Sequence, residues 1–329
     1  MELRTRLNIE PSADKITYSD KVMFIGSCFA SSIGKQMEMG RMQVMINPAG
    51  TVFNPVSVLN TIDTIISEKE YLEGDLYYYD GNYISFNHYT SFSSEDPLIT
   101  LEKINNNSKH ALTFFKEAKF LFITFGTARV YRRKKSGKIV SNCHKLPQEE
   151  FISEILTVND IVSSWVKELD RLHALYPRLK IVFTISPVRH WKDGAHGNQV
   201  SKSVLFLAIE ELLAHPASPQ YFPAYELVMD DLRDYRFYND DMFHPSTAAI
   251  NYIWEEFSAC YLESKTLKIW KEVLGITRAF NHRLTGRSSE RIKQFAEKML
   301  TQISDLENKV PTIDLSQERD YFNSLLKRE

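Results

Sequence analysis

Residues 22–30 read VMFIGSCFA, four apolar residues followed by Gly26, Ser27 and Cys28, and good helix formers continue from Ser31 to Met39. A short apolar run that ends at small residues is typical of a buried strand, and the residues after it favour a helix. This stretch therefore predicts a strand, a tight turn and a helix.

Two further apolar runs, Phe120–Phe125 and Ile181–Ile185, have the same character. Continuous apolar strands are typical of a parallel sheet that is covered on both faces. Residues 149–175 have helical periodicity and stop before Pro177, which predicts a crossover helix between these strands. We therefore expect an α/β chain with a three-layer α/β/α fold and a mostly parallel sheet.

Two segments depart from this alternation. Residues 71–94 are rich in Tyr, Phe, Asn, Gly and Ser, which favours strands or an ordered loop inserted into the domain, with aromatic side chains that pack. Residues 265–326 are typical of amphipathic helices interrupted near Gly286 and Pro311. We expect one domain over residues 1–262 and a helical region over 263–329, whose apolar stripes pack either on that domain or against a partner.

The charge balance argues against several classes of partner. The chain of 329 residues has 40 Lys and Arg against 42 Asp and Glu, so its net charge of -2 creates no basic field that would attract nucleic acid or anionic lipid. The basic run Arg132–Lys138 contains the turn residues Ser136 and Gly137, and it is interpreted as a solvated hairpin tip. We expect neither nucleic acid nor a membrane as a partner, and the oligomeric state stays open.

The cysteines and the apolar stretches bear on location. Cys28, Cys143 and Cys260 are an odd number without CxxC spacing, which disfavours a disulfide framework and a zinc ribbon. The N-terminal residues lack an apolar signal region, and no apolar stretch approaches the ~18 residues of a membrane span. We expect a cytoplasmic protein.

Cys28 is a candidate nucleophile because of its place at the strand-to-helix turn. Such a thiol lies beside unpaired helix N–H groups, and we expect these amides and the helix dipole to lower its pKa from about 8.5. The alternative is a buried structural thiol, since free cysteine is among the most buried residue types.

Asp241 and His244 form a candidate acid and base pair. They precede a helical run, Thr247–Phe257, for which Ser246 is the expected N-cap. An Asp three residues before a His on one loop can hold the imidazole by its Nδ1–H, so that Nε2 faces a nucleophile. An N-capping or solvated Asp is the alternative for this half of the pair.

The chain resembles the GSCFA-domain family, which is itself similar to the GDSL or SGNH hydrolases. The motif Gly26–Ala30 carries the resemblance, and further matching segments extend it over residues 22–257. These segments are Asn47–Pro55, Gly126–Tyr131, Asn142–Lys145, Ser186–His190 and the block from Tyr221 to Pro245.

The resemblance implies roles for individual residues. Cys28 stands at the place of the nucleophilic serine, with Ser27 as the rival nucleophile, and the terminal block maps onto Asp241 and His244. The Gly50 backbone N–H is an oxyanion candidate by its position in the second block.

The third block of the superfamily is Gly-x-Asn, but Ala128 stands where that Asn would bind the oxyanion. Thr127, Asn142 or His144 can replace its donor, because all three belong to matching segments. His144 is also a candidate substrate contact, as are Arg189 and His190, which suit a carboxylate or phosphate group or simply rim the cleft. The turn-forming segment 193–198 is interpreted as a lid or as an ordinary connection.

The function implied by the resemblance is ester hydrolysis through a Cys or Ser, His and Asp constellation, on an acyl or O-acetyl ester that can be linked to a carbohydrate. Two alternatives stay open: an acyltransferase to a sugar or carrier, and a non-catalytic ligand-binding module. We expect no cofactor. We also expect no metal, since the adjacent Cys143 and His144 usually cannot both face one ion.

Overall fold

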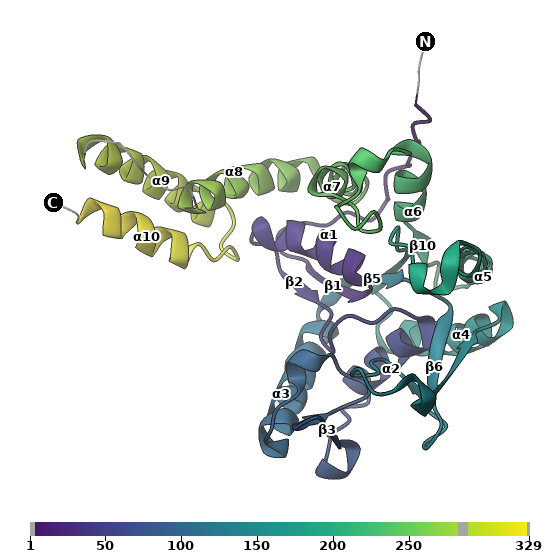
Figure 1. The fold of residues 1–329 in the computed structure, drawn as a ribbon. Helices are drawn as coiled ribbons and strands as arrows, with labels where there is room; N and C mark the ends of the chain where they lie inside the picture. The colour runs from purple at the N-terminus through teal and green to yellow at the C-terminus, as the bar shows by residue number, and fades with distance from the viewer. Residues whose placement is uncertain (1–3, 282–288, 328–329) are drawn as a thin grey trace.

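The computed structural model describes residues 4–281 and 289–327, and a five-stranded parallel sheet lies at its centre (Figure 1). The strand order is β10-β9-β5-β1-β2, and each neighbouring pair is parallel. The strands are β1 Lys21–Gly26, β2 Val44–Ile46, β5 Ala118–Phe125, β9 Lys180–Ile185 and β10 Gln220–Tyr221. The predicted parallel sheet and its three apolar strands are confirmed.

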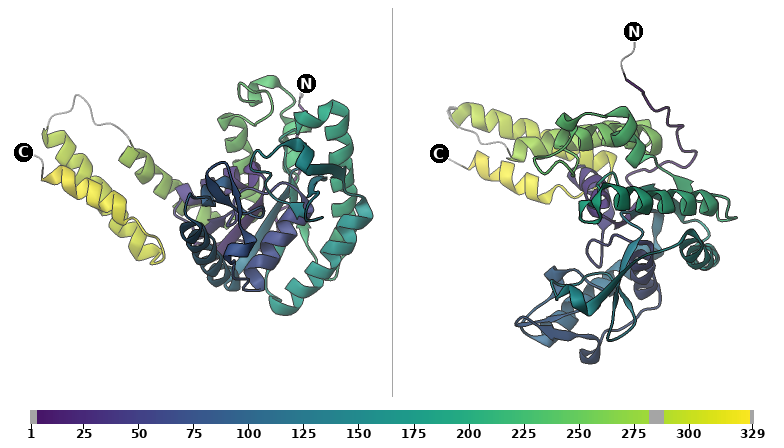
Figure 2. Two further views of the ribbon diagram at one scale, coloured as in Figure 1. Left: turned by 60° about the horizontal axis from the view of Figure 1, so that its bottom comes forward. Right: turned by 45° about the vertical axis from the view of Figure 1, so that its right-hand side comes forward.

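Side chains alternate between the two faces of this sheet, and each face is covered by helices. Phe24, Phe122 and Val182 belong to one buried cluster, whereas Ile25 and Ile123 belong to a second. The first face is covered by α1 Cys28–Met39, α6 Ala224–Glu226 and α7 Thr247–Tyr261, and α8 Ser264–Asn281 packs on α1 and α7. The second is covered by α2 Pro55–Ile66, α3 Pro97–Lys116, α4 Val158–Leu175 and α5 Gly194–Leu213 (Figures 1 and 2). The expected three-layer α/β/α fold is confirmed.

The prediction of one helix over residues 149–175 is wrong at its start. Residues 151–155 form strand β8 Phe151–Ile155, which pairs antiparallel with β6 Arg129–Arg133. The helix α4 begins at Val158, because the Thr157 hydroxyl accepts a hydrogen bond from the Asp160 N–H and caps it. Backbone pairing with β6 therefore outweighs the helical periodicity of these residues.

A second hairpin strand confirms a hairpin at the basic run, whose residues 134–138 are exposed, whereas Arg133 is buried rather than solvated. β7 Ile139–Val140 pairs antiparallel with β6, and Gly137 has a φ of 66° at the turn between them. Arg132, Lys134 and Lys135 thus lie at the end of a hairpin. The three strands form a small sheet of order β7-β6-β8.

The aromatic insertion is a two-stranded hairpin, β3 Tyr77–Tyr79 and β4 Asn82–Ile84, between short turns of 3-10 helix. The Arg133 guanidinium lies 4.3 Å from the Tyr77 ring centre and 4.4 Å from that of Phe86. This contact joins the insertion to the small sheet, so these aromatic side chains pack, as expected.

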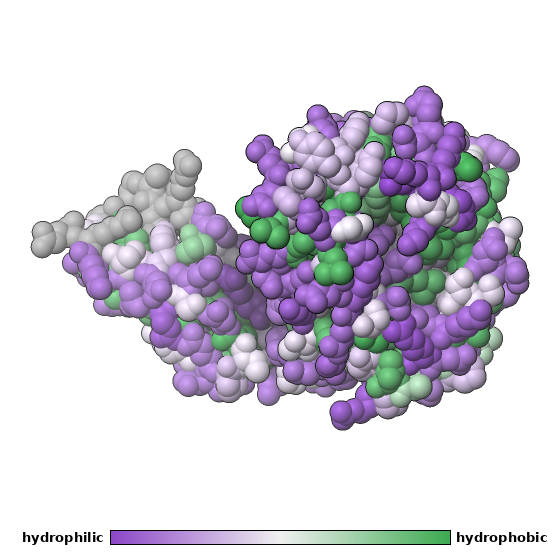
Figure 3. Space-filling view, turned by 90° about the horizontal axis from the view of Figure 1, so that it is seen from below, coloured by the Kyte–Doolittle hydropathy of each residue, from purple (hydrophilic) through white to green (hydrophobic). Residues whose placement is uncertain are grey.

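The C-terminal region is helical, as predicted, and consists of α8, α9 Ser289–Lys309 and α10 Ser316–Leu326. The expected break at Pro311 lies between α9 and α10, and the break near Gly286 lies outside the described residues. α9 and α10 lie side by side beyond the end of α8, as an extension from the domain (Figures 1 and 2). Its outer end stands apart from the domain in the space-filling view (Figure 3).

The apolar stripes of these helices join the core of the domain. Trp270 and Ile303 belong to the same buried cluster as Phe24. The Trp270 Nε1–H donates to the Gln36 carbonyl at 2.7 Å, and Arg41 of the α1–β2 turn pairs with Glu318 of α10. Packing on the domain is therefore the observed arrangement. Among the described residues, no helix has the length and apolar character needed to cross a membrane.

We expect Trp270→Ala to lower the free energy of unfolding by about 3–5 kcal/mol, because it leaves a cavity between α1, α7 and α8. Leu207→Ala, at a position 59% exposed on α5, is the control and should cost far less. Denaturant unfolding of both variants measures this. Equal free energies of unfolding of the two variants would mean that the packing of α8 adds little to the stability of the domain.

Candidate active site

The turn after β1 is held in one conformation by its neighbours. Gly26 has a φ of 147°, and a Cβ atom there would lie 2.2 Å from the Thr124 carbonyl oxygen. Its N–H donates to the Asn47 side chain at 2.8 Å, and the Ser27 N–H donates to the Thr124 carbonyl at 3.2 Å. These contacts place Cys28 at the first position of α1, above the carboxyl edge of the sheet.

Ser27 and Cys28 have different surroundings. Ser27 is 1% exposed, and its hydroxyl accepts a hydrogen bond from the Phe29 N–H at 3.3 Å as the N-cap of α1. Cys28 is only half-buried. A small molecule in solution therefore reaches the Cys28 sulfur more readily than the Ser27 hydroxyl.

Asp241 and His244 make the contact that their spacing predicts. The Nδ1 of His244 lies 2.6 Å from the Oδ2 of Asp241. The other Asp241 oxygen accepts the backbone N–H groups of His244 and Phe243, both at 2.9 Å. These backbone bonds, followed by the bond to the imidazole, lower the Asp241 pKa to about 2. An ionised Asp241 favours a proton on Nδ1 and leaves Nε2 with a free lone pair.

The helix that follows His244 also begins where the sequence predicts it. The Ser246 hydroxyl accepts from the Ala249 N–H and caps α7. The His244 and Asp241 side chains are each 47% exposed, so the imidazole is open to solvent.

Lys202 on α5 is a residue of this region that the sequence analysis missed. Its side chain is fully buried, and its ammonium donates to the carbonyl oxygens of Gly126 at 2.7 Å and Ser186 at 2.6 Å. These two carbonyls follow strands β5 and β9. Burial lowers the Lys202 pKa to about 7, and an ionised Cys28 would oppose this effect.

Two more side chains of α5 bind the same loops. The Asn198 carbonyl oxygen accepts the His190 N–H at 2.9 Å, and the Ser201 hydroxyl accepts the Ala128 N–H at 2.7 Å. α5 begins at Gly194, so residues 194–198 are its first turn rather than a loop. We call Asn198, Ser201 and Lys202 the polar face of α5.

His190 lies at the end of β5. Its Nε2 would be 3.1 Å from a Cβ atom on Gly126, and its ring meets the Phe53 ring edge-on at 5.7 Å. Burial lowers the His190 pKa to about 4, and the charges of Lys202 and His244 act in the same direction. His190 is therefore neutral at pH 7 and lies within electrostatic range of both groups.

The Cys28 thiol does not have the lowered pKa that its helix position predicts. Burial raises its pKa above the ordinary value and outweighs the N–H groups of Phe29 and Cys28, which lower it. Among charged side chains, Lys202 lowers it and Asp241 raises it. Among these groups, Asp241 belongs to the loop that carries His244.

Other candidate residues have different partners. The Gly50 N–H donates to the Asn47 carbonyl at 2.7 Å, and the Thr127 N–H donates to the Phe53 carbonyl at 3.0 Å, so the structure gives both amides an acceptor. The Thr127 hydroxyl lies 2.9 Å from the Ser201 hydroxyl.

Asn142 and His144 contact the aromatic insertion. The Asn142 amide donates to the Thr90 hydroxyl at 3.4 Å, and the His144 Nε2 lies 2.8 Å from the Ser85 carbonyl. Burial lowers the His144 pKa. Both residues thus have partners in the insertion rather than in the turn at Cys28.

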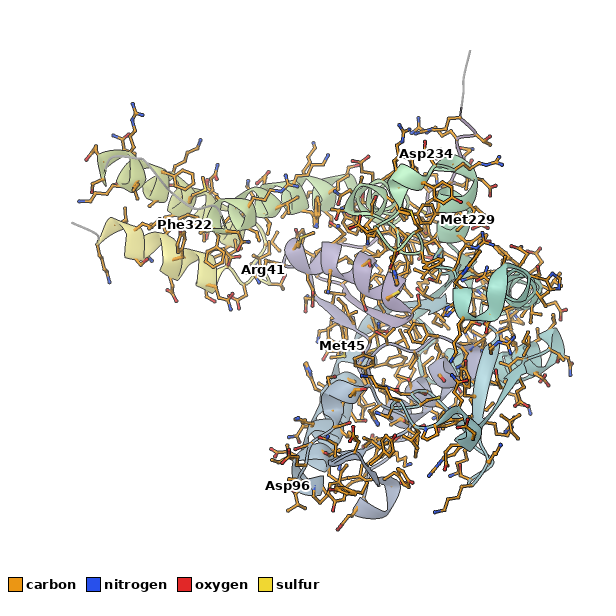
Figure 4. The ribbon with its side chains drawn as sticks, viewed as in Figure 1. Arg41, Met45, Asp96, Met229, Asp234 and Phe322 are labelled. Atoms are coloured by element: carbon orange, nitrogen blue, oxygen red, sulfur yellow. The ribbon has the colours of Figure 1, made fainter. Side chains whose placement is uncertain are left out.

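A cleft of about 690 Å³ opens beside the loop that carries Asp241 and His244. Arg189 follows β9, and the Trp191 ring lies tilted by 30° against the Phe243 ring with ring centres 5.5 Å apart. Figure 4 labels two lining residues, Met229 and Asp234. The lining residues are Arg189, Trp191, Val228, Met229, Arg233, Asp234, Tyr235, Tyr238, Met242 and Phe243.

Most of the sequence matches models of known protein families. The model of the GSCFA family matches residues 21–257. The chain belongs to the GSCFA family. A second model, the C-terminal domain of GSCFA domain proteins, matches residues 273–328, so the likeness of this GSCFA protein extends into helices that its motifs alone do not reach.

No curated protein matches this GSCFA chain. Two solved structures are similar to it at low identity. One is a carbohydrate esterase family 3 protein from Talaromyces cellulolyticus, with 10% identity over 77% of this chain and 99% of that chain and a TM-score of 0.34. The other is the acetyl xylan esterase Est2A from the rumen bacterium Butyrivibrio proteoclasticus, with 11% identity over 74% of this chain and 63% of that chain and a TM-score of 0.34.

Metal ligands do not gather in the part of the chain that the structure describes. Within residues 4–281 and 289–327, no three His, Cys, Asp or Glu side chains are grouped so that they hold a metal ion.

We expect iodoacetamide to alkylate Cys28 slowly at pH 7, with a rate that still rises above pH 9, because burial raises the thiol pKa. Peptide mass spectrometry across a pH series measures this rate for each cysteine separately. Cys28→Ser gives the background from Cys143 and Cys260. A rate that levels off below pH 8 would show that the helix amides lower the Cys28 pKa by more than burial raises it.

Proposed function

We propose that this GSCFA protein is an ester hydrolase in which the Cys28 sulfur attacks the ester carbonyl. The observation that carries the proposal is the 2.6 Å contact between His244 Nδ1 and Asp241 Oδ2 on a loop whose charge acts on Cys28. Asp241 holds the imidazole in this way although its side chain is 47% exposed, and a nucleophile, a base and an orienting acid act as one unit in acyl transfer.

The raised pKa of Cys28 means that the reaction needs a general base, for which we propose His244. The thiol keeps its proton at neutral pH, so it needs a base to become nucleophilic. His244 Nε2 accepts the S–H proton as the sulfur bonds to the carbonyl carbon. It then donates that proton to the oxygen of the leaving alcohol, and a thioester on Cys28 remains.

Water completes the cycle. His244 Nε2 takes a proton from water as its oxygen attacks the thioester carbonyl, the C–S bond breaks, and the thiolate regains the proton from His244. The N–H of Cys28 lies in the first turn of α1, where helix amides have no acceptor within the helix, and it is the donor that we propose for the oxyanion.

The exposure of His244 favours hydrolysis over acyl transfer. With its side chain 47% exposed, water reaches the imidazole directly. Transfer enzymes instead benefit from a site that excludes water from the acyl intermediate.

The cleft lined by Met242 and Phe243, the two residues before His244, is the proposed substrate site, for a small-molecule or carbohydrate ester. Its volume lies within the roughly 300–1,000 Å³ of small-ligand sites. Among the residues that the structure describes, neither Arg189 nor Arg233 pairs with a carboxylate, and the Arg189 Nε is buried without a partner. We therefore propose that the substrate carries a carboxylate or phosphate that Arg189 binds.

A panel of short acyl esters tests the reaction. Cys28→Ala and His244→Ala should each lower kcat at least about a hundredfold, because each removes a group that moves in the bond-making step. Ser27→Ala should keep most activity and lose some thermal stability, since its hydroxyl caps α1. Full activity of His244→Ala would refute the mechanism.

The same panel distinguishes the alternatives. When a sugar acceptor is offered, mass spectrometry of the products should detect free acid only. An acylated sugar would favour a transferase. Pairs of esters with and without a carboxylate, assayed in Arg189→Met, should show a higher KM for the anionic member alone. Failure of every ester would favour a binding module.

A further inference from the structure

The chain departs from the parallel ladder at Asn47, the residue after β2. Strand β2 ends at Ile46, and the Asn47 N–H still donates to the Phe24 carbonyl at 2.8 Å. In a continued ladder with this register, the next bond would join the Gly26 N–H to the Asn47 carbonyl. Asn47 instead has a φ of 46°, and its carbonyl accepts the Gly50 N–H at 2.7 Å. The Gly26 N–H therefore needs another acceptor.

The side chain of Asn47 supplies that acceptor and makes a second bond at the same time. Its Oδ1 accepts the Gly26 N–H at 2.8 Å, and its Nδ2 donates to the Ser31 hydroxyl oxygen at 2.8 Å. Gly26 is the last residue of β1, Ser31 lies in α1, and Cys28 lies between them in the chain. One carboxamide therefore joins the two ends of the turn that carries Cys28.

The second bond reaches the part of α1 next to Cys28. Residues three apart in a helix are neighbours on its surface, with roughly 5–6 Å between their Cβ atoms, and Ser31 is three residues after Cys28. A bond to the Ser31 hydroxyl therefore holds the helix turn on which Cys28 lies. Asparagine suits position 47 because it tolerates the left-handed φ and its carboxamide has both a donor and an acceptor.

We propose that Asn47 is a positioning residue of the candidate active site: its carboxamide ties the end of β1 to the start of α1 and so fixes the place of the Cys28 sulfur. Asn47 acts through Cys28 and is not among the residues that line the proposed substrate cleft. The name nucleophile for Cys28 rests on the proposed function, whereas the place of its sulfur does not, so the two are tested apart.

The test is cysteine alkylation in the full-length variant Asn47→Gly. Glycine adopts the left-handed φ without strain, so this variant removes the two side-chain bonds and keeps the two main-chain bonds. The charges of Lys202 and Asp241, which act on Cys28, stay the same. A loosened turn exposes Cys28 and reduces the burial that raises its pKa. Iodoacetamide should therefore alkylate Cys28 about tenfold faster at pH 8, with a pH profile moved to lower pH.

Ester turnover should change in the opposite direction. Asn47→Gly should lower kcat by roughly tenfold and leave KM near that of wild type, because a displaced sulfur slows bond formation while the cleft is intact. A cysteine that reacts faster with a small reagent and more slowly with an ester has lost its position. Absence of ester turnover in wild type would refute the proposed function alone, because the alkylation rates would still decide the role of Asn47.

Cys260 and the variant Asn105→Ala are the controls. Cys260 is 5% exposed, so general unfolding would speed its alkylation as well. Asn105 of α3 also makes two side-chain bonds: it accepts the Tyr71 N–H at 2.9 Å and donates to the Tyr71 carbonyl at 3.0 Å. Asn105→Ala loses as many bonds, but its Cys28 profile should equal that of wild type. An unmoved Cys28 profile in Asn47→Gly, or equally faster alkylation of Cys28 and Cys260, would overturn the proposal.

Ser31→Ala provides the test if Asn47→Gly does not fold. It removes one of the two side-chain bonds of Asn47, and alanine is a better helix former than serine, so the melting temperature should change little. Alkylation of Cys28 at pH 8 should become about threefold faster, since one bond still holds the turn, and that of Cys260 should not change. An unchanged Cys28 rate in Ser31→Ala would refute the proposal even if the protein hydrolyses esters.

Discussion

The close approach of Gly26 to the Thr124 carbonyl is the constraint on which the site depends. Any side chain at position 26 would collide with β5, so the chain turns sharply there and α1 begins two residues later. The Asn47 side chain fixes the same turn from β2 by accepting the Gly26 N–H. Because three neighbouring strands hold this turn, Cys28 has a fixed place relative to Lys202 and to the His244 loop. An alanine at position 26 would displace the proposed nucleophile itself.

Burial decides the electrostatics of the site. The helix amides and Lys202 favour a thiolate, but desolvation of Cys28 outweighs them, so the resting thiol is protonated. A protonated thiol is consistent with a base held by a strongly ionised Asp241. Burial also lowers the pKa of Lys202 to about 7 and that of His190 to about 4, so His190 is neutral at pH 7.

Much of this arrangement is predictable from the sequence. The apolar run before Gly26, the Asp241 and His244 spacing and the Ser246 cap each depend on neighbours in the chain, and each is confirmed by the structure. The raised thiol pKa was not predictable, because it depends on burial by residues far away in the sequence. Residues 151–155 were misassigned because they pair with β6, whose residues lie 18 to 26 positions earlier in the chain, from Arg133 opposite Phe151 to Arg129 opposite Ile155. The sequence does contain a signal for Lys202. Asn198, Ser201 and Lys202 lie at helical spacing on the same buried face of α5 as Leu205 and Ile209. Polar residues on such a face indicate a site.

The most direct test of Cys28 as the nucleophile is acid-quenched mass spectrometry during ester turnover. The account predicts one added acyl mass on the peptide that contains Cys28, with fragmentation that assigns it to the sulfur, and no such mass in Cys28→Ala. An acyl group on Ser27, or undiminished turnover by Cys28→Ala, would contradict it.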